Sequence, residues 1–553
     1  MLMRSNNFFK IIIFIFYLLY LVLGLLIYKD FGITTDEEFQ RYSGFYWLQY
    51  ILNFTPFENL KLVVEGKLLE ISSFTLPNPK DFPFYGVIFD LPLAFYESLF
   101  QINDSQNYFY LRHKVNFLLF FISSIYVYKI LRNRFNENFL TIVGILLYIT
   151  SPRIFGDSFF NNKDIVFLSL ITISIYYCFK VIDNFNYKNI FLFSLIAAIA
   201  TSARIIGVFL PISLILIKLF GELDKKFDLN FLTKILIFLF LYFLFLTILW
   251  PYLWDDPLTN FLKAFSIFSN YIIDIKFLFD GSYVSSKKLP LLYIPTWIII
   301  STPVFTIICF IIGYSFCFRR ILLNVLNIEK KKDIWINKEE EKDFYIFANF
   351  TLIVAYLIFS NTVLYNGWRQ VYFLHFFIVY FAFFGIKYCF IYLTVLRNLK
   401  GYVVLVYLLI ILLPIFQIYK LHPFQSFYFN SLISKKNIHN YYEVDYWGLS
   451  GRNFLEKLIK INNDKEKIKV AVASWIPLNR SLSILNYENK EKIEIFGQNY
   501  HEANYIFLNN TSEVNKYYNK KYEIPKNYEK IEELIIGKIL VYEIFKKKIN
   551  NSP

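Results

Sequence analysis

The chain has 553 residues, with 57 Lys and Arg against 43 Asp and Glu, and a formal net charge of +14. Hydrophobic residues make up 56% of it and charged residues only 18%, which excludes an ordinary soluble protein because the apolar residues also fall in long blocks. The positive charge does not indicate a nucleic-acid partner, because no basic stretch is interleaved with aromatic residues on a soluble module. In a membrane protein such an excess is typical of loops on one side.

The first apolar block ends in a group of carboxylates. Residues 11–28 carry no charge over 18 positions, and at ~1.5 Å per residue such a helix approaches the ~30 Å hydrocarbon core. No small-residue cleavage site follows, so the block is predicted to be a retained span rather than a signal peptide. Asp36, Glu37 and Glu38 stand together in the next stretch, "GITTDEEFQRYSG". A solvated loop or an active site at the membrane surface would explain them.

Eleven membrane spans are predicted along the chain. They lie at residues 8–28, 112–131, 138–152, 164–182, 189–203, 205–219, 231–250, 291–318, 343–360, 371–390 and 401–419. The third is short, and a tilted or re-entrant segment is the alternative there. The stretch 189–220 holds a single charge, Arg204, at its centre, so a tight hairpin is predicted with Arg204 at its outer turn.

Charges in the short loops predict the orientation. Basic pairs such as Arg132 with Arg134 and Arg319 with Arg320 are expected on the cytoplasmic side. The amino terminus is then inside and the carboxyl terminus outside. Three external loops follow, at residues 29–111, 151–164 and 251–290.

Two further elements are expected on the outer side. In "FYGVIFDLPLAFYESLF", Asp90 and Glu97 are seven residues apart and share one face of a helix, which suits a helix lying in the membrane interface. After the membrane domain, residues 1–420, the chain becomes polar. "KIKVAVASW", "KIEIFG", "ANYIFLNN" and "GKILVYEIF" read as short strands, which predicts a small external α/β domain at residues 421–553.

Polar residues at the predicted outer span ends converge on one face. They are Asp36 and Glu37 of the first loop, Arg153, Lys163 and Asp164 of "SPRIFGDSFFNNKDIVF", Arg204 of the hairpin, and Arg369 of "LYNGWRQVYF". Each of these residues, taken alone, could be a charged side chain near a span end that simply extends to the membrane interface. Span interiors, in contrast, hold almost no charge, whereas a transporter usually places its site near the midplane. The set therefore favours an enzyme that acts on a lipid-borne substrate.

Transfer of a sugar from a polyprenyl-phosphate donor needs this combination of groups. A carboxylate accepts the proton of the attacking hydroxyl, and Lys or Arg stabilises the charge that develops on the leaving phosphate. Asp36 and Asp164 could also share a divalent cation such as Mg²⁺ or Mn²⁺, which prefers oxygen ligands. An O-antigen ligase or polymerase and a non-catalytic transporter of lipid-linked glycans are the alternatives.

These motifs, in this order, resemble the GT-C membrane glycosyltransferases. The acidic pair after the first span, the Asn-x-Lys-Asp of the second loop and "LYNGWRQVYF" are similar to the protein O-mannosyltransferases and lipid A aminoarabinose transferases, in an uncharacterised bacterial subgroup. "HPFQSFYFN" and "YEVDYWGLSGRNFLEKL" resemble the segments that open the external tail of that subgroup. The chain departs from the later motif at Asn366 and Gln370, where Asp and His are common.

The resemblance implies a polytopic all-α GT-C fold and an inverting glycosyltransferase. It implies a polyprenyl-phosphate sugar as donor and a glycan, lipid or protein as acceptor, at the outer, periplasmic face of a bacterial cytoplasmic membrane. By motif, Asp36 is the acceptor-activating carboxylate, Glu37 its helper and Asp164 the second acid. Lys163, Arg153 and Arg369 are expected at the donor phosphate. Arg204 joins them by its predicted position.

Overall fold

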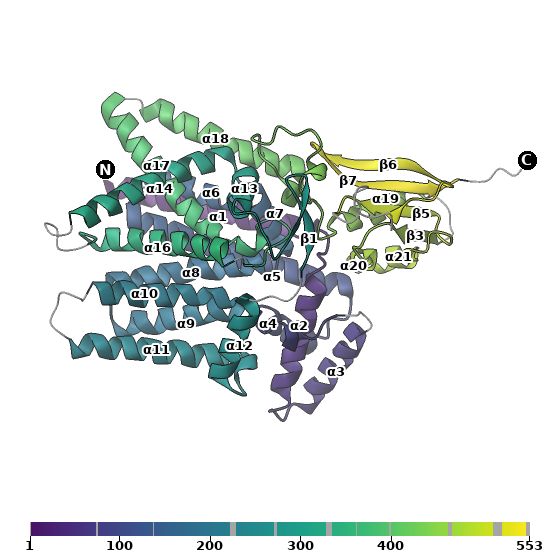
Figure 1. Cartoon of the computed structure of the whole chain (residues 1–553), viewed down its shortest axis with the longest axis horizontal. Helices are drawn as coiled ribbons and strands as arrows, with labels where there is room; N and C mark the ends of the chain where they lie inside the picture. Colours follow the sequence, from purple (N-terminus) through teal and green to yellow (C-terminus); the bar gives the residue numbers. More distant parts are fainter. Residues whose placement is uncertain are drawn as a thin grey trace, which may run out of the picture.

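A computed structural model gives the structure of residues 2–72, 76–136, 138–221, 228–269, 274–327, 334–360, 362–397, 400–462, 467–511 and 522–548. Figure 1 shows a bundle of long helices with a smaller sheet-containing domain at one end, while the amino terminus lies at the other end. The helices of the bundle are α1 (Leu2–Ile27), α5 (Ser105–Phe135), α6 (Asn138–Ile149), α7 (Pro152–Phe160), α8 (Asp164–Asp183), α9 (Tyr187–Ala203), α10 (Phe209–Phe220), α11 (Leu229–Leu249), α13 (Tyr293–Ser301), α14 (Val304–Leu326), α16 (Lys338–Phe359), α17 (Leu374–Arg397) and α18 (Lys400–Leu421).

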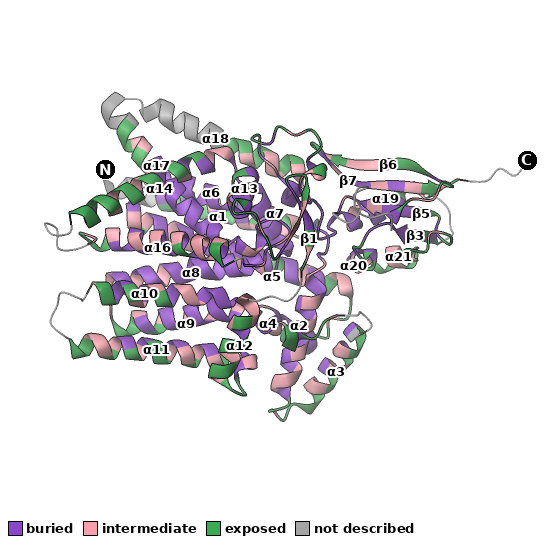
Figure 2. Ribbon diagram, in the orientation of Figure 1, coloured by how far each residue is buried: buried purple, intermediate pink, exposed green. Residues whose placement is uncertain are grey.

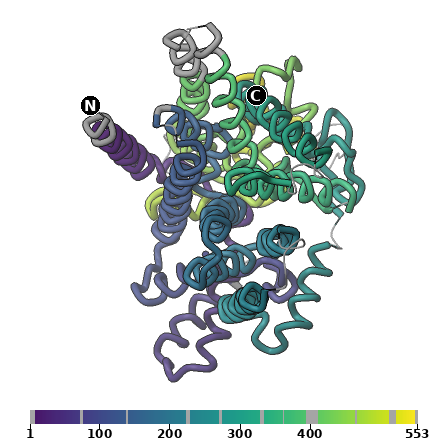
Figure 3. The backbone as a smooth tube through the Cα atoms, turned by 90° about the vertical axis from the view of Figure 1, so that its left-hand side faces the viewer, coloured from purple at the N-terminus to yellow at the C-terminus, as the bar shows by residue number. Residues whose placement is uncertain are grey.

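Within the described residues, seven helices are long and apolar enough to cross a membrane, or up to eight if the bent pair α6 and α7 counts as one span. Three shorter apolar helices, Tyr187–Ala203, Ile205–Phe220 and Ile411–Leu421, coincide with the remaining predicted spans. The chain is a multi-pass membrane protein, as the sequence predicts. The predicted number of eleven is reached only when these short helices are counted. Figure 3 shows α1 at the edge of the bundle, and the apolar part of this helix is only 22% buried.

Prolines explain two breaks in the predicted spans. The span predicted at 138–152 ends at a bend of 60° between α6 and α7, where Pro152 occupies the first turn of α7. Proline is favoured there because the first turn has no use for its missing N–H group. The span predicted at 291–318 is likewise divided, because α13 ends at Ser301 and α14 begins directly after Pro303.

The core of the bundle lies around α8. Its apolar stretch is 83% buried, and Figure 2 shows buried residues concentrated along the centre of the bundle. Because α8 is enclosed on all sides, its first residue, Asp164, is also held inside the protein. The amino-terminal end of α8 faces the end of the bundle that carries the smaller domain (Figure 1).

The first loop folds into a helical subdomain of its own. Its elements are α2 (Glu37–Leu52), α3 (Glu58–Ser72), η1 (Pro79–Asp81) and α4 (Asp90–Leu99). The acidic face of α4 does not point outward, as was expected for a helix lying in the membrane interface. Asp90 and Glu97 are buried, and the exposed side of α4 carries Phe95 and Leu99 instead. Glu97 turns inward because Arg41 and Arg112 bind it at 2.6 and 2.9 Å.

The later loop and the carboxyl-terminal domain supply the strands. The loop contains α12 (Pro257–Ser269) and a hairpin, β1 (Lys276–Phe279) with β2 (Ser282–Ser285), which the sequence reading did not predict. The domain contains α19 (Ser450–Ile461), α20 (Leu478–Leu482), α21 (Tyr487–Glu491), β3 (Ile468–Val472), β4 (Ile493–Ile495), β5 (Tyr505–Asn509), β6 (Tyr528–Ile536) and β7 (Ile539–Lys547). The four predicted strands are β3, β4, β5 and β7, and β6 was missed. Their sheet has the order β4-β3-β5-β7-β6.

Candidate active site

Asp36 is a partly exposed carboxylate at the start of α2. It occupies the N-cap position in a helical conformation, but its side chain makes no capping hydrogen bond. One oxygen, Oδ2, accepts a hydrogen bond from Arg369 Nη1 at 3.0 Å and lies 3.7 Å from Lys163 Nζ. The side chain remains 34% exposed, although Arg369 is only 3% exposed. Asp36 can therefore meet a substrate while two cations hold it.

A tight turn places Arg369 beside it. Asn366 and Gly367 both have positive φ, of 57° and 79°, a backbone region that Gly and Asn adopt at little cost. The chain then enters a short helical turn, η4 (Arg369–Val371). The guanidinium of Arg369 is also held over the ring of Trp447, 4.8 Å from its centroid. These contacts fix the direction of a side chain that would otherwise be mobile.

Asp164 is the buried counterpart of Asp36. It lies 2.7 Å from Arg204 and 3.5 Å from Arg369, and its side chain has no exposed surface. Asn161 orients it twice: the Asn161 amide donates to Asp164 Oδ2 at 3.1 Å, and Asn161 Oδ1 accepts the Asp164 backbone N–H at 2.9 Å. Arg369 thus bridges the two acids. Asp164 holds Arg204 and Arg369 in place and does not face the solvent.

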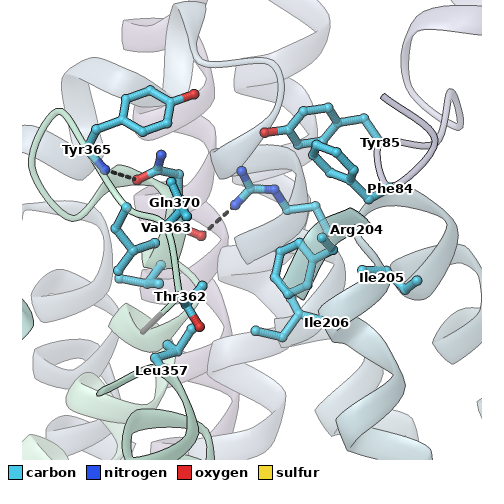
Figure 4. A pocket seen from close by; sticks show the side chains of 13 residues that line it. Phe84, Tyr85, Arg204, Ile205, Ile206, Leu357, Thr362, Val363, Tyr365 and Gln370 are labelled. Atoms are coloured by element: carbon cyan, nitrogen blue, oxygen red, sulfur yellow. Dashed lines mark hydrogen bonds between the residues drawn. The ribbon is translucent and has the colours of Figure 1, made fainter. Parts of the chain in front are cut away.

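Arg204 lies at the turn between α9 and η2 (Ile205–Val208), where the hairpin prediction placed it. The first loop approaches this turn closely, because Tyr85 forms an isolated backbone bridge with Arg204. Gly86 permits the approach, since a Cβ there would lie 1.5 Å from the carbonyl oxygen of Ser202. Figure 4 shows the guanidinium of Arg204 between Tyr85 and Tyr365, donating to the carbonyl oxygen of Gln370.

We refer to Asp36, Lys163, Asp164, Arg204 and Arg369 as the ionic cluster. Burial by itself would raise the pKa of Asp36, but the charges of Arg369 and Lys163 outweigh it and lower this pKa to about 2. Asp36 is therefore ionised at any physiological pH. A carboxylate with so low a pKa is a poor base for as long as both cations remain on it.

The cluster opens into a cavity of about 400 Å³. Three parts of the chain line it: the first loop with Asp36, the bundle with Lys163 and Arg369, and the later segments with β1 and the carboxyl-terminal domain. The lining residues are Thr35, Asp36, Phe39, Leu76, Pro77, Phe82, Tyr85, Lys163, Ile275, Lys276, Tyr365, Asn366, Arg369, Glu443, Trp475 and Arg480. Cations and aromatic rings together suit a ligand with an anionic group and an apolar face.

A second, smaller pocket of about 50 Å³ adjoins this cavity, with Tyr85 and Tyr365 lining both. It is mostly apolar, and Arg204 stands at its polar side (Figure 4). Phe268 of α12 contributes to its lining.

Two predicted site residues point elsewhere. Glu37 accepts hydrogen bonds from Thr34 and lies 2.9 Å from His113, and its side chain is fully buried. It fixes the loop that carries Asp36. Arg153 donates to the carbonyl oxygen of Tyr428 at 2.9 Å and packs over Phe429, so it ties α7 to the chain that follows α18. Neither residue lines the cavity.

The residues present do not fit a divalent cation shared by Asp36 and Asp164, which the sequence left open. Arg369 is bound to both carboxylates and occupies the position between them. Within the described part of the chain, no group of three or more His, Cys, Asp or Glu side chains could hold a metal ion. We therefore derive no step through a metal.

The cavity-lining residues that sequence reasoning missed include Tyr85, Lys276, Trp475 and Arg480. Lys163 lies 4.0 Å from the centroid of Tyr85, and Arg480 pairs with Glu38 at 2.9 Å. An isolated aromatic or basic residue in a long loop carries no local signal for such contacts. The glycine that follows Tyr85 was the one available hint that two backbone segments approach closely here.

Comparisons with known proteins find a matching family model and similar solved structures. Residues 99–254 match the family model described as dolichyl-phosphate-mannose-protein mannosyltransferase, a range that contains Lys163, Asp164 and Arg204. No curated protein matches the chain. Among solved structures, the chain is similar to ArnT from Cupriavidus metallidurans bound to undecaprenyl phosphate, with 9% sequence identity, a TM-score of 0.41, and coverage of 96% of this chain and 97% of that one.

Proposed function

We propose that this chain, a membrane glycosyltransferase of the GT-C type, moves a sugar from a polyprenyl-phosphate donor to an acceptor hydroxyl with inversion at the anomeric carbon. The reaction takes place in the cavity next to the ionic cluster. We place this end of the bundle at the outer face of the cytoplasmic membrane, because the basic loops predicted to be cytoplasmic lie at the other end. The observation that carries the proposal is one partly exposed carboxylate, Asp36, held by Arg369 and Lys163 at the edge of a large cavity.

The cations of the cluster receive the donor phosphate. Lys163 and Arg369 reach the cavity, and Arg204 stands beside the apolar pocket that adjoins it. A phosphate bound there accepts charge-assisted hydrogen bonds, which strengthen as negative charge develops on the leaving oxygen. The mostly apolar lining of that pocket suits the start of the isoprenoid chain of the carrier. Asp164 takes no part in proton transfer and keeps Arg204 and Arg369 oriented.

Donor binding converts Asp36 into a base. The phosphate competes with Asp36 for Lys163 and Arg369, the two cations that lower the pKa of this carboxylate to about 2. As they turn to the phosphate, the pKa of Asp36 rises toward its ordinary value, because burial then opposes ionisation with less compensation. The carboxylate therefore becomes an effective base once the donor is in place.

The chemical step is a single displacement at the anomeric carbon. The acceptor oxygen forms a bond to the anomeric carbon while the bond from that carbon to the phosphate oxygen breaks. The electron pair of the broken bond goes to the phosphate, facing Lys163 and Arg369. The acceptor proton goes to Asp36, which later gives it to water. Holding both substrates in one cavity supplies much of the rate enhancement.

Replacing the carboxylate tests this role. We expect Asp36→Asn to reduce transfer from a defined polyprenyl-phosphate sugar by about 10²–10⁴-fold, the usual contribution of general base catalysis. The chain should still fold, because Asp36 makes no capping bond and is partly exposed. The assay is release of polyprenyl phosphate from purified protein in lipid nanodiscs.

Asp81→Asn is the matched control, since Asp81 is an exposed acid of the same first loop and does not line the cavity. It should transfer sugar at the wild-type rate. Full activity of D36N would eliminate Asp36 as the base. An inactive wild-type protein with every polyprenyl-phosphate sugar would contradict the choice of donor.

A further inference from the structure

The carboxyl-terminal domain completes the cavity. Trp475 and Arg480 of this domain line it together with Asp36 of the first loop. Trp475 follows β3, the strand that has parallel neighbours on both sides, β4 and β5. The chain leaves β3 toward β4 and leaves β5 toward the opposite edge of the sheet. In open α/β sheets, ligands bind outside the carboxyl ends of strands where connections diverge in this way.

The backbone around Trp475 is fixed while its ring is left open. The N–H of Ala473 donates to the carbonyl of Phe507 at 2.7 Å, and the Ser474 hydroxyl donates to Asn509 Oδ1 at 2.6 Å. The N–H of Ile476 then donates to the same hydroxyl at 3.2 Å. The Trp475 side chain nevertheless stays 41% exposed, and no aromatic pair within the described residues includes its ring.

Arg480 holds this loop against the turn that carries Asp36. Its Nε lies 2.9 Å from Glu38 Oε2, and its Nη1 donates to the carbonyl of Thr35. Thr35 and Glu38 flank Asp36 on either side in the sequence. The position of the domain is thereby coupled to the position of the carboxylate, and Trp475 lines the cavity from a backbone that hydrogen bonds hold in place.

We propose that Trp475 is the stacking platform for a sugar ring of the acceptor, so that the acceptor is a saccharide. The proposal rests on the proposed function. One face of a pyranose presents C–H groups that pack on an indole ring, while the hydroxyls at its edge need polar partners. Glu443 and Lys276 line the same cavity and offer such groups.

The position of the platform assigns it to the acceptor rather than to the donor. The cations for the donor phosphate belong to the bundle, whereas Trp475 enters from the carboxyl-terminal domain. Inversion requires the attacking oxygen to approach the anomeric carbon from the side opposite the leaving phosphate. An acceptor bound on the domain side, with Asp36 near its hydroxyl, satisfies that requirement.

Saturation-transfer NMR tests the proposal on the full chain in nanodiscs. The probes are the methyl glycosides of glucose, galactose, mannose and N-acetylglucosamine, with N-acetylserine amide as a non-sugar hydroxyl. We expect transfer to the ring C–H protons of at least one glycoside and none to the serine derivative. Trp475→Ala should weaken the Kd for that glycoside about tenfold, the effect of losing one stacked aromatic contact, and Trp475→Phe should restore most of it.

Trp254→Ala is the matched control, because Trp254 is exposed to a similar extent, 38%, but packs near Tyr50 and Phe54 outside the cavity. It should bind the glycoside as the wild type does. A Kd that is unchanged in W475A, a wild type that binds no glycoside, or one that binds the serine derivative instead would overturn the proposal. Titration of polyprenyl phosphate in the same samples separates the two questions. Its failure to bind to the wild type contradicts the proposed donor, while normal binding to W475A shows that the donor site is intact.

Discussion

Asp90 is an acid held beside the ionic cluster but outside the cavity. It is buried at the start of α4, where it accepts a hydrogen bond from Asn162 at 3.2 Å. Burial raises its pKa to about 7, although Arg112 and Lys163 nearby favour the charged form and Glu37 opposes it. The folded protein therefore binds this proton more tightly than the unfolded chain does.

The stability of the protein should depend on pH through this residue. Below pH ~4 the carboxyl is neutral in both states, so it has no effect; between pH ~4 and 7 the folded state alone keeps the proton, and its stability falls as the pH rises. We expect Asp90→Asn to raise the melting temperature at pH 8 and to leave it unchanged near pH 4. Thermal unfolding in nanodiscs measures this. A D90N protein that is less stable than the wild type at pH 8 would show that the charge of Asp90 is stabilising.

Individual residues differ in how far the sequence predicted them. Asp36 and Asp164 followed from motifs, and Arg204 from its position in an apolar stretch. Glu37 was assigned with Asp36 because the two are adjacent, but successive residues at the start of a helix point about 100° apart, so one faces the cavity and the other His113. Trp475 lies more than four hundred positions from Asp36 in the sequence, and no local sequence pattern indicates that the two residues line the same cavity.

At the scale of elements, one buried carboxylate holds the first loop together. Glu97 of α4 binds Arg41 of α2 and Arg112 of α5, and all three side chains are at most 4% exposed. The spacing of Asp90 and Glu97 correctly predicted a shared helical face. It could not reveal that this face points inward, because the partners lie on other elements.

We expect Glu97→Ala to destabilise the protein by roughly 3–5 kcal/mol, because it leaves two buried guanidinium groups without their partner. The measurement is the free energy of unfolding of the first loop, followed by hydrogen exchange of α2 and α4. Glu58→Ala, an exposed acid of α3, serves as the control and should have little effect. Equal protection of α4 in E97A and the wild type would argue against this role.

The elements that carry lining residues of the cavity, such as β1 and the start of α2, lie toward one end of the molecule, and the amino terminus lies at the other (Figure 1). Glu58 lies on the first loop, and Asn327 directly follows α14 at the opposite end; both are exposed. If the cavity faces outward, an impermeant maleimide should label Glu58→Cys in intact cells and label Asn327→Cys only after lysis. Cys178, Cys309, Cys317 and Cys389 are first replaced by Ala. The reverse pattern would invert the proposed topology.

The large-scale architecture was predicted well because its signals are local. Apolar length predicts membrane helices, whereas the direction that the basic loops predict stays a prediction. The sequence reading missed the hairpin of β1 and β2 and the strand β6. In β6, at the edge of the sheet, charged residues such as Glu529, Glu532 and Glu533 obscure the alternation of polar and apolar residues. The cavity is assembled from the first loop, the bundle and the last domain. This assembly depends on long-range packing, which cannot be inferred from local patterns in a single sequence.

In the proposed reaction, the excess of positive charge in the ionic cluster, three basic against two acidic side chains, bears on the release of the spent carrier. A glycosylated donor is a phosphodiester with one negative charge, whereas the carrier left behind is a monoester whose second proton dissociates near pH ~6. The site therefore holds its product more firmly than its substrate. We expect free polyprenyl phosphate to inhibit competitively with the donor, more strongly at pH 8 than at pH 5, as initial rates would show. Equal inhibition at both values would contradict this expectation. Turnover in the cell then depends on how quickly the empty carrier is withdrawn.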